Sequence, residues 1–388
     1  MKILFIVPSY KPAYIYGGPI VSVARLAESL VQIGHSVTVY TTTANGRTEL
    51  DMPLKEPVMM DGVQVKFFKR ITKDHTHVSP SLWKATWSTV DEYDAVHIHS
   101  WWNFLIMGAS LICTMKGVKP VLSPRGMLCE YIFNSRNQLK KKVLHNVIGK
   151  YLLSKTYLHV TSQVEWNDCL RLNDSWRGGL IHNIVDLPYL PDKKEQSKAD
   201  GIFTISFLSR IDPKKGLDIL LHALSGVNFN YRLRIAGSGE EAYVQQMKKI
   251  ISNNGMDDKV EWVGWKGSQE KFAFFAESDL FALTSHNENF AVVVIESLSV
   301  GTPVLVSEHV GLAKYVQDKR LGWVTGIGSV EEVRINLQQA YHSREDRRRI
   351  REQAVEIIRQ DFDEVKLATD YVDMYRNVND IRIKRNQA

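Results

Sequence analysis

Short apolar segments alternate with helical patterns along this chain, and the alternation runs through it twice. Segments such as Lys2–Val7 and Ala95–His99 have the length and composition of buried strands. Helical patterns, such as the one over Ile20–Ile33, separate most of them. Strands that alternate with helices predict a parallel sheet covered on both faces. The strands expected in the first half are Lys2–Val7, Ser36–Tyr40, Val63–Phe68, Ala95–His99, Pro120–Ser123, Tyr157–Thr161 and Leu180–His182.

The alternation stops near Leu187–Glu195, a polar stretch with two prolines that is the best candidate for a linker. It then restarts. A chain of 388 residues also favours two domains over one. We therefore predict two doubly wound, Rossmann-like α/β domains that face each other across a cleft: 1–186, a linker over 187–200, and 201–362, followed by a C-terminal segment over 363–388. The later strands are expected at Phe203–Leu208, Arg232–Ala236, Val260–Val263, Leu280–Leu283 and Val304–Val306, with helices at Leu217–Ser225, Glu241–Ser252, Gln269–Phe275 and Ala291–Val300.

Composition indicates a globular protein of a reducing compartment. Apolar residues make up 44% and charged residues 24%. The three cysteines are scattered without metal-binding spacing. Pro8 ends the first apolar run too early for a signal peptide, and no run has the roughly 18 apolar residues of a membrane span. We expect a cytoplasmic protein.

Positive charge is concentrated in the first half of the chain. Residues 1–185 contain 21 Lys and Arg against 13 Asp and Glu, whereas the remainder contains 28 against 30. A basic first half that faces an acidic ligand or surface is one interpretation, and a solvated surface without function is the other. We expect no nucleic acid partner.

Two carboxylates with seven residues between them, Glu288 and Glu296, are the strongest candidates for binding a ligand. A helix that begins near Ala291 would leave Glu288 in the preceding loop and put Glu296 about one and a half turns in. Glu296 lies in an apolar helix, and buried carboxylates need partners. Carboxylates can hold hydroxyl groups while a helix N-terminus faces an anion, which suits a nucleotide sugar.

Other unusual loops follow predicted strands, at the edge where parallel sheets bind ligands. Arg210 and Lys215 follow the first strand of the second half. They could converge on a diphosphate, as fixed cations for a leaving group, or belong to a solvated run of charges. Gly237 begins a glycine turn whose role is structural or a backbone contact to phosphate or sugar. Val263 precedes Gly264–Trp265, where the backbone could pair with a nucleobase edge.

In the first half, Gly17 and Gly18 open a helix, which allows backbone N–H groups to approach a phosphate. His97 and His99 point to one face of a strand, where metal binding, packing and substrate contact all remain open. No third ligand has recognisable spacing, so we predict no metal. Arg125 lies between Pro124 and Gly126, a setting that suits an anion-facing guanidinium.

Together these residues resemble the retaining glycosyltransferases of glycosyltransferase family four, which have the GT-B fold. The resemblance covers nearly the whole chain. It rests most on the Glu288 to Glu296 spacing, with Phe290 and Gly301–Val304 in register, and next on Arg210 with Lys215.

The resemblance implies a set of roles. Arg210, Lys215 and Glu288 would be catalytic: the two cations would grip the donor diphosphate, and Glu288 would contact the donor sugar. Glu296 would hold the ribose hydroxyls. Transfer would retain anomeric configuration without an essential metal or cofactor, and a C-terminal helix would cross back onto the first domain. The resemblance also implies donor contacts at Asn289, Phe290 and Ala291, and at Gly17 and Gly18, which would face the phosphates or the acceptor. From their own positions in the sequence, Gly237 and Val263 are further candidates for donor contact, and His99 and Arg125 are candidates for contact with acceptor or sugar.

The sequence also departs from the family pattern. Asn289 and Ala291 stand where glycine is frequent, and Arg125 stands where a histidine-glycine pair is common. The Ser123–Met127 segment resembles a branch found in surface-polysaccharide pathways. The expected partners are therefore a nucleotide-diphosphate sugar and a glycan or a polyprenyl-diphosphate-linked acceptor, in envelope or capsular polysaccharide synthesis.

A basic amphipathic segment contains Lys140, Lys141 and Lys142 among apolar residues at helical spacing. It is either a packed helix with a solvated lysine face or a surface that docks on the anionic inner leaflet of the membrane. Alternatives for the whole chain are a non-catalytic subunit that binds a nucleotide sugar or glycan, and a nucleotide-sugar epimerase. A nicotinamide-dependent oxidoreductase is disfavoured because the Gly-x-Gly-x-x-Gly pattern is missing.

Overall fold

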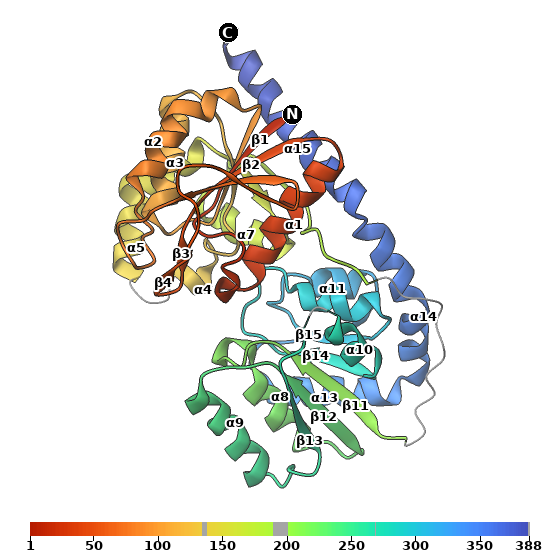
Figure 1. Ribbon diagram of the computed structural model, residues 1–388. Helices are drawn as coiled ribbons and strands as arrows, with labels where there is room; N and C mark the ends of the chain where they lie inside the picture. Colours follow the sequence, from red (N-terminus) through yellow and green to blue (C-terminus); the bar gives the residue numbers. More distant parts are fainter. Residues whose placement is uncertain (134–137, 189–200, 268, 387–388) are drawn as a thin grey trace. The chain divides into compact units, whose positions relative to one another are not determined.

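The computed structural model describes residues 1–133, 138–188, 201–267 and 269–386. The chain forms two compact α/β units (Figure 1). Unit 1 contains Met1–Ile184 and Asp363–Ala388, and unit 2 contains Val185–Phe362. From residue 189 to residue 200 the predicted linker lies outside the described residues.

Unit 1 is built on an eight-stranded sheet with the order β10-β9-β8-β7-β1-β2-β6-β5. Every neighbouring pair is parallel except β5 and β6. Four of the five residues of β1 and all five of β7 are buried, as expected for central strands covered on both faces. The strands are β1 (Lys2–Ile6), β2 (Ser36–Thr42), β5 (Val58–Met60), β6 (Val63–Phe68), β7 (Ala95–His99), β8 (Val121–Ser123), β9 (Tyr157–Val160) and β10 (Gly178–Leu180), with a separate hairpin of β3 (Ala44–Asn45) and β4 (Thr48–Glu49).

Helices cover both faces of this sheet. Helix α1 begins where Gly17, at a φ of 73°, turns the chain, and Pro19 lies in its first turn, where a missing N–H costs no hydrogen bond. The helices of unit 1 are η1 (Tyr14–Tyr16), α1 (Gly18–Gln32), α2 (Pro80–Thr89), η2 (Val90–Glu92), α3 (Phe104–Met115), α4 (Glu130–Phe133), α5 (Gln138–Leu144), η3 (His145–Gly149), α6 (Lys150–Ser154), α7 (Gln163–Leu172) and α15 (Glu364–Asn386).

Unit 2 is built on a six-stranded, wholly parallel sheet with the order β13-β12-β11-β14-β15-β16. The strands are β11 (Phe203–Leu208), β12 (Tyr231–Ala236), β13 (Val260–Gly264), β14 (Leu280–Leu283), β15 (Val304–Ser307) and β16 (Gly322–Thr325). The helices are η4 (Pro213–Lys215), α8 (Leu217–Leu224), α9 (Glu241–Asn253), α10 (Glu270–Ala276), α11 (Val292–Ser299), α12 (Ala313–Asp318), α13 (Val330–His342) and α14 (Arg344–Asp361).

The strand order reverses direction once in each sheet. In unit 1, β1 lies between β2 and β7, and in unit 2, β11 lies between β12 and β14. Loops at the carboxyl ends of the two strands at such a switch point diverge and leave a crevice for ligands. The prediction of two doubly wound α/β folds is therefore confirmed, and the fold itself indicates where each unit can bind a ligand.

One predicted strand is misplaced, and the observed strands β3, β4, β5 and β16 were not predicted. The strand expected over Leu180–His182 is instead β10, which begins at Gly178 and ends at Leu180. The backbone of Gly178 packs closely against β9, since a Cβ there would lie 2.4 Å from the Leu158 carbonyl oxygen. Strand β16 was not expected, since it has four residues and begins with glycine.

A buried chain of hydrogen bonds attaches α15 to the sheet of unit 1. The Tyr375 hydroxyl lies 2.8 Å from His97 Nδ1, and His97 Nε2 lies 2.6 Å from Ser123 Oγ. Ser123 Oγ in turn lies 2.5 Å from His159 Nδ1, and His159 Nε2 donates to the Ile181 carbonyl at 3.1 Å. Because that carbonyl only accepts, His159 carries a proton on Nε2. Burial lowers the pKa of both rings and favours their neutral form, so Ser123 donates to His159 Nδ1 and His97 carries its proton on Nε2.

We predict that this neutral chain makes the protein sensitive to acid. Burial lowers the pKa of His159 to about 3 and that of His97 well below its usual value. Between pH 6.5 and pH 3 the unfolded chain therefore binds a proton at residue 159 that the folded chain refuses, and stability is lost as pH falls. The free energy of unfolding, measured in urea from pH 7 to pH 4, should decrease with pH less steeply for His159→Gln than for wild type. The difference in slope should be about 1.4 kcal/mol per pH unit.

The exposed His75 supplies the matched control. His75→Gln removes a histidine without touching the chain of hydrogen bonds. Equal slopes for wild type and His159→Gln would show that His159 does not couple folding to pH.

Candidate active site

The loops after β11 and β14, the switch-point strands of unit 2, are joined by two hydrogen bonds to backbone carbonyls. Thr284 Oγ1 donates to the Gly216 carbonyl at 2.7 Å, and the His286 N–H donates to the Lys214 carbonyl at 2.8 Å. Gly216 has a φ of 66°, and a Cβ on it would lie 2.1 Å from the Thr284 carbonyl oxygen. Only glycine fits this position, so the two loops are held in one register.

Lys215 and Glu288 form an ion pair across these joined loops. Their side chains are 15% and 16% exposed. The backbone of Glu288 is fixed as well, because its N–H donates to the His309 carbonyl at 3.0 Å and its carbonyl accepts from the Gly311 N–H at 2.8 Å. Two of the three predicted catalytic residues are thus in contact.

The third, Arg210, lies on the same loop but does not join the pair. Its side chain is exposed, and within the described ranges it makes no hydrogen bond or ion pair. Arg210 therefore presents an uncommitted guanidinium at the carboxyl edge of the sheet.

Glu296, the second predicted carboxylate, is buried in α11 and faces a cation that the sequence did not indicate. The residue is 6% exposed, and Lys271 Nζ of α10 lies 2.5 Å from its Oε1. Burial raises the pKa of Glu296, and Lys271 acts in the opposite direction. The expectation that this carboxylate needs a partner is met by Lys271.

The segment between the two glutamates contains a strained residue. Helix α11 begins at Val292, one residue later than predicted, and Ala291 before it has a φ of 68° and a ψ of 70°. This left-handed conformation favours glycine. Phe290 is buried with its ring 6.2 Å from that of Phe362, and Asn289 is partly buried.

Gly237 and Val263 lie at the same edge of the sheet. A Cβ on Gly237 would lie 1.8 Å from the Ser209 carbonyl oxygen, so this glycine allows the loops after β11 and β12 to approach. Its observed role is therefore structural. Val263 is partly buried in β13, directly before Gly264.

In unit 1, Gly17 is partly exposed and Gly18 is exposed at the start of α1. A Cβ built on either glycine would meet no neighbouring atom within 4 Å. Space for a ligand therefore remains beside their backbone. His99 ends β7 and Arg125 follows β8, so both lie near the switch point of this sheet.

Among the described residues, the Arg125 side chain has only neutral hydrogen-bond partners. It has a φ of 56°, and its guanidinium lies 2.5 Å from Asn183 Oδ1, 3.4 Å from Ser22 Oγ and 3.3 Å from His99 Nδ1. The contact with Nδ1 leaves the His99 proton on Nε2. Burial and the nearby Arg125 charge hold the pKa of His99 well below its usual value, and burial lowers the pKa of Arg125. A cation and a neutral ring thus share this site.

Sequence reasoning missed three residues that fix the site: Lys271, Asn183 and Ser22. Asn183 stands in the His182–Asp186 segment at the end of unit 1, and Ser22 lies one turn into α1. The apolar surroundings of Glu296 did signal that a cation was required, but nothing in the sequence identified which one.

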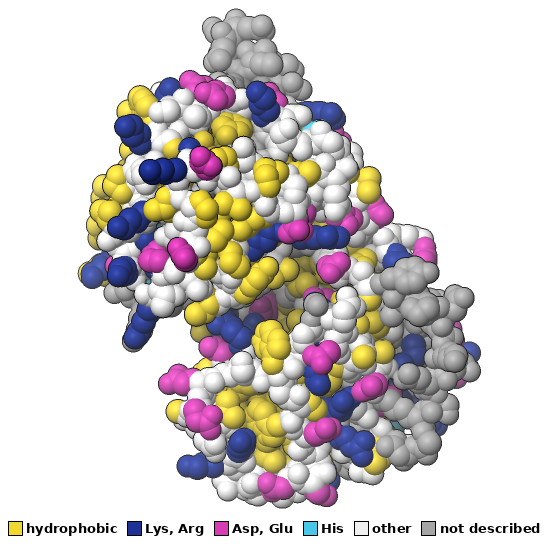
Figure 2. Space-filling view, in the orientation of Figure 1, with side chains coloured by type: hydrophobic (Ala, Val, Ile, Leu, Met, Phe, Trp, Pro, Cys, Tyr) yellow, Lys and Arg dark blue, Asp and Glu magenta, His cyan; other side chains and the backbone are white. Residues whose placement is uncertain are grey.

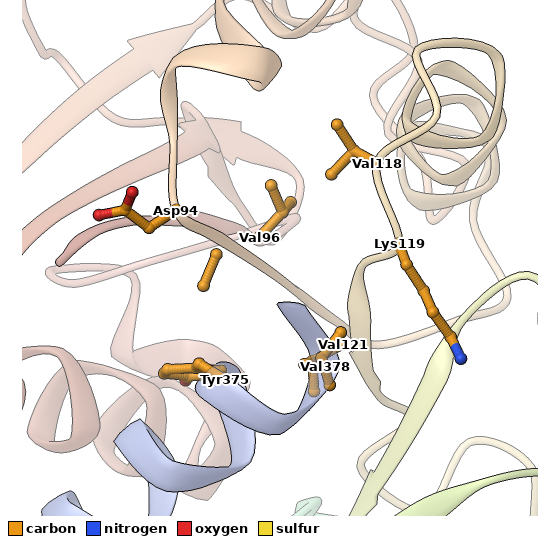
Figure 3. Close-up of a pocket in the computed structure, with 8 residues that line it drawn as sticks. Asp94, Val96, Val118, Lys119, Val121, Tyr375 and Val378 are labelled. Carbon is orange, nitrogen blue, oxygen red and sulfur yellow. The ribbon is translucent and has the colours of Figure 1, made fainter. Parts of the chain in front are cut away.

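A small pocket lies at the opposite edge of the unit 1 sheet (Figure 3). Asp94 and Lys119 precede β7 and β8, and Tyr375 and Val378 reach it from α15. It lies at the amino ends of the strands, away from the candidate residues. Among the residues that the structure describes, no group of three His, Cys, Asp or Glu side chains could hold a metal ion, and no helix is long and apolar enough to cross a membrane.

We predict that Ala291→Gly stabilises unit 2. An alanine in the left-handed region is strained by about 1–2 kcal/mol, and glycine removes this strain. Part of the gain is lost because glycine gives the unfolded chain more conformational freedom. The free energy of unfolding in urea should rise by about 0.5–1 kcal/mol.

The exposed Ala273, in the middle of α10, provides the control. Ala273→Gly should lower the same free energy by about 1 kcal/mol, because glycine weakens a helix interior. A loss of similar size for both variants would refute the assignment of strain to Ala291.

Two family models match the chain, and their matches follow the two units closely. The model for Glycosyltransferase Family 4 matches residues 16–188, and the model for Glycosyl transferases group 1 matches residues 191–356. The second match includes Arg210, Lys215, Glu288 and Glu296.

Similar curated proteins are also glycosyltransferases. An uncharacterised glycosyltransferase of Methanocaldococcus jannaschii is 26% identical over 360 residues, which cover 84% of this chain and 85% of that protein. A putative colanic acid biosynthesis glycosyltransferase of Escherichia coli, WcaL, is 28% identical over 151 residues, about a third of each chain.

Solved structures share the fold over nearly the full length. The Anabaena protein HepE, solved with UDP and glucose, has a TM-score of 0.74 at 20% identity and covers 97% of this chain and 100% of its own. Sucrose-phosphate synthase of Thermosynechococcus elongatus has a TM-score of 0.73 at 16% identity, with coverage of 98% and 100%. With both units matched by family models and the expected strand order present in each, the chain belongs to glycosyltransferase family four and has the GT-B fold.

Proposed function

We propose that this glycosyltransferase is a retaining, metal-independent enzyme. It moves a hexose-type sugar from a nucleotide-diphosphate sugar to a glycan or to a polyprenyl-diphosphate-linked acceptor, in envelope or capsular polysaccharide synthesis. The observation that carries the proposal is the Lys215–Glu288 ion pair, fixed at the switch point of unit 2.

In the proposed reaction, the bond between the anomeric carbon and the leaving phosphate oxygen breaks, and the acceptor hydroxyl oxygen bonds to that carbon on the same face. The hydroxyl proton passes to the leaving phosphate, and a nucleoside diphosphate is released. Negative charge grows on the diphosphate as the bond breaks. Lys215 and Arg210 would stabilise that charge more than the ground state, which lowers the barrier.

The carboxylates would orient the donor. Glu288 would accept hydrogen bonds from the sugar hydroxyls, and its pairing with Lys215 holds its side chain in place. Glu296 would bind the ribose. In unit 1, Arg125 and His99 would contact the acceptor or the sugar, since the Arg125 guanidinium has only neutral hydrogen-bond partners among the described residues.

The names of similar proteins support the proposed substrates. HepE has been solved with UDP-glucose, and relatives include putative colanic acid and amylovoran biosynthesis glycosyltransferases. These substrates and pathways belong to those proteins, and we extend to this chain only the class of donor and the class of product.

We predict that Lys215→Ala and Glu288→Gln each reduce turnover of the correct donor by roughly 10²–10³-fold, the usual cost of removing one fixed stabilising group. The measurement is release of nucleoside diphosphate from a panel of nucleotide sugars, with acceptor present. Activity should persist in EDTA.

The exposed Lys249 on α9 is a suitable control, and Lys249→Ala should leave turnover unchanged. Binding of a donor without any turnover, in wild type as in the variants, would instead favour a non-catalytic nucleotide-sugar-binding subunit.

We further propose that unit 1 docks on the inner face of the cytoplasmic membrane through α5, η3 and α6. Leu139, Val143, Val147 and Tyr151 recur every four residues and are 75%, 55%, 76% and 53% exposed. Exposed apolar side chains in a row along a helix suit the boundary between lipid headgroups and acyl chains.

Charge around this apolar row is positive. Residues 131–164 contain no Asp or Glu. Lys140, Lys142 and Lys150 are exposed, whereas Lys141 donates to the Ile132 carbonyl at 2.6 Å. On the face shown in Figure 2, basic and hydrophobic side chains gather over the part of unit 1 where Figure 1 places α2 and α5. An anionic lipid surface complements both properties.

We predict that Lys140→Ala with Lys142→Ala weakens binding to vesicles that contain phosphatidylglycerol by roughly 30-fold, at about 1 kcal/mol for each lysine. Flotation with phosphatidylcholine alone should show little binding. The control is Lys248→Ala with Lys249→Ala on α9, which removes two exposed lysines from unit 2. Equal binding by both double variants would contradict docking through α5.

A further inference from the structure

Glu296 is an unusual side chain to find at its position in α11. Its neighbours in the helix are Ile295, Ser297 and Leu298, and all of them are fully buried. A carboxylate in such surroundings tends to bind a proton, because water no longer stabilises its charge. Burial accordingly raises the pKa of Glu296.

Lys271 counters this effect from a neighbouring helix. It lies on α10, one residue after the first of the helix, and packing of α10 on α11 brings its ammonium group to 2.5 Å from Glu296 Oε1. The lysine and glutamate side chains are 20% and 8% exposed, so water screens their attraction only weakly. Lys271 therefore favours the ionised carboxylate.

The two oxygens of Glu296 are not equivalent. Oε1 accepts from Lys271, whereas no residue in the described ranges donates to Oε2. Lys271 therefore fixes the position of Oε1, whereas the lone pairs of Oε2 can accept hydrogen bonds from a ligand. An ionised carboxylate that is anchored in this way can accept hydrogen bonds from two adjacent hydroxyl groups, such as the 2′ and 3′ hydroxyls of ribose.

We propose that Lys271 is a positioning residue for donor binding: it anchors Glu296 through Oε1 so that the carboxylate can receive the ribose hydroxyls of the nucleotide. The proposal rests on the proposed function, in which Glu296 binds the ribose. Lys271 itself need not touch the nucleotide.

A second negative charge near Glu296 makes its ionised form depend more strongly on Lys271. Asp186, at the start of unit 2, is a second negative charge that raises the pKa of Glu296. Helix α14 also packs on α11, but its Arg351 donates to the Ser278 carbonyl at 3.1 Å. Lys271 is the cation that offsets both burial and Asp186.

The test compares two ligands in two proteins. UDP, GDP and ADP are titrated into full-length wild type by calorimetry, and the nucleotide that binds is then used with its 2′,3′-dideoxy analogue. Lys271→Met should weaken binding of the ribonucleotide by roughly 10-fold, the usual effect of a lost charge-assisted hydrogen bond. The dideoxy analogue should bind both proteins equally, since it has no hydroxyl groups for Glu296.

The same titrations between pH 8 and pH 5.5 supply a second readout. Without Lys271, the pKa of Glu296 rises further, so ribonucleotide affinity of Lys271→Met should fall more steeply than that of wild type as pH decreases. Lys271→Arg should restore both affinity and pH profile. Lys249→Met, on the exposed face of α9, should behave as wild type.

Each outcome decides the proposal. If Lys271→Met weakens ribonucleotide and dideoxynucleotide equally, Lys271 acts on folding alone and the inference is overturned, while the proposed function stands. If wild type binds none of the three nucleotides, the proposed function fails and the inference fails with it.

Discussion

A carboxylate that is withdrawn from water needs a cation or hydrogen-bond donors beside it, and in unit 2 both glutamates of the candidate site face a lysine. Glu288 is paired with Lys215 and Glu296 with Lys271. In each pair the two residues come from different segments, so neither pair can form until strands and helices have packed. Removal of one partner would leave the other charge buried and unmatched, which is far more costly than removal of both. The pairs therefore link the chemistry of the site to the packing of the sheet.

Unit 1 handles buried polar groups in another way. His97 and His159 stay neutral and pass hydrogen bonds in one direction, from the Tyr375 hydroxyl to the Ile181 carbonyl. Beside them, the hydrogen-bond partners of Arg125 within the described part of the chain are an amide, a hydroxyl and a neutral ring. Unit 2 thus presents anions that are already neutralised, whereas unit 1 presents a cation whose described contacts are uncharged. Different ligand groups suit the two environments.

The strands and the edge of the candidate site could be predicted because they depend on local pattern. Segments such as Phe203–Leu208 and Leu280–Leu283 match observed strands residue for residue, since continuous apolar runs between turn residues have few alternatives. The Glu288 to Glu296 spacing likewise placed one carboxylate before α11 and the other within it. Short or glycine-containing strands such as β10 and β16 were misplaced or missed, because their stability comes from neighbouring strands.

Partners could not be predicted, because they depend on packing between distant segments. Lys271 reaches Glu296 through the crossing of α10 and α11, and Asn183 reaches Arg125 from 58 residues away. Ala291 was identified as a departure from glycine, but only the backbone shows that it occupies a left-handed conformation. The roles of the site residues remain predictions that the proposed experiments address.

The assignment of α15 to unit 1 has a consequence for how the protein is made. Helix α15 supplies Tyr371 and Tyr375, both fully buried against strands that are synthesised more than 200 residues earlier. On the ribosome, unit 2 can complete its core while unit 1 still lacks α15, the helix that covers part of its sheet. During that interval His97 has no tyrosine hydroxyl to accept from, and apolar surface on the first sheet stays open to chaperones and to wrong contacts. Unit 1 can therefore complete its core only after α15 has been synthesised.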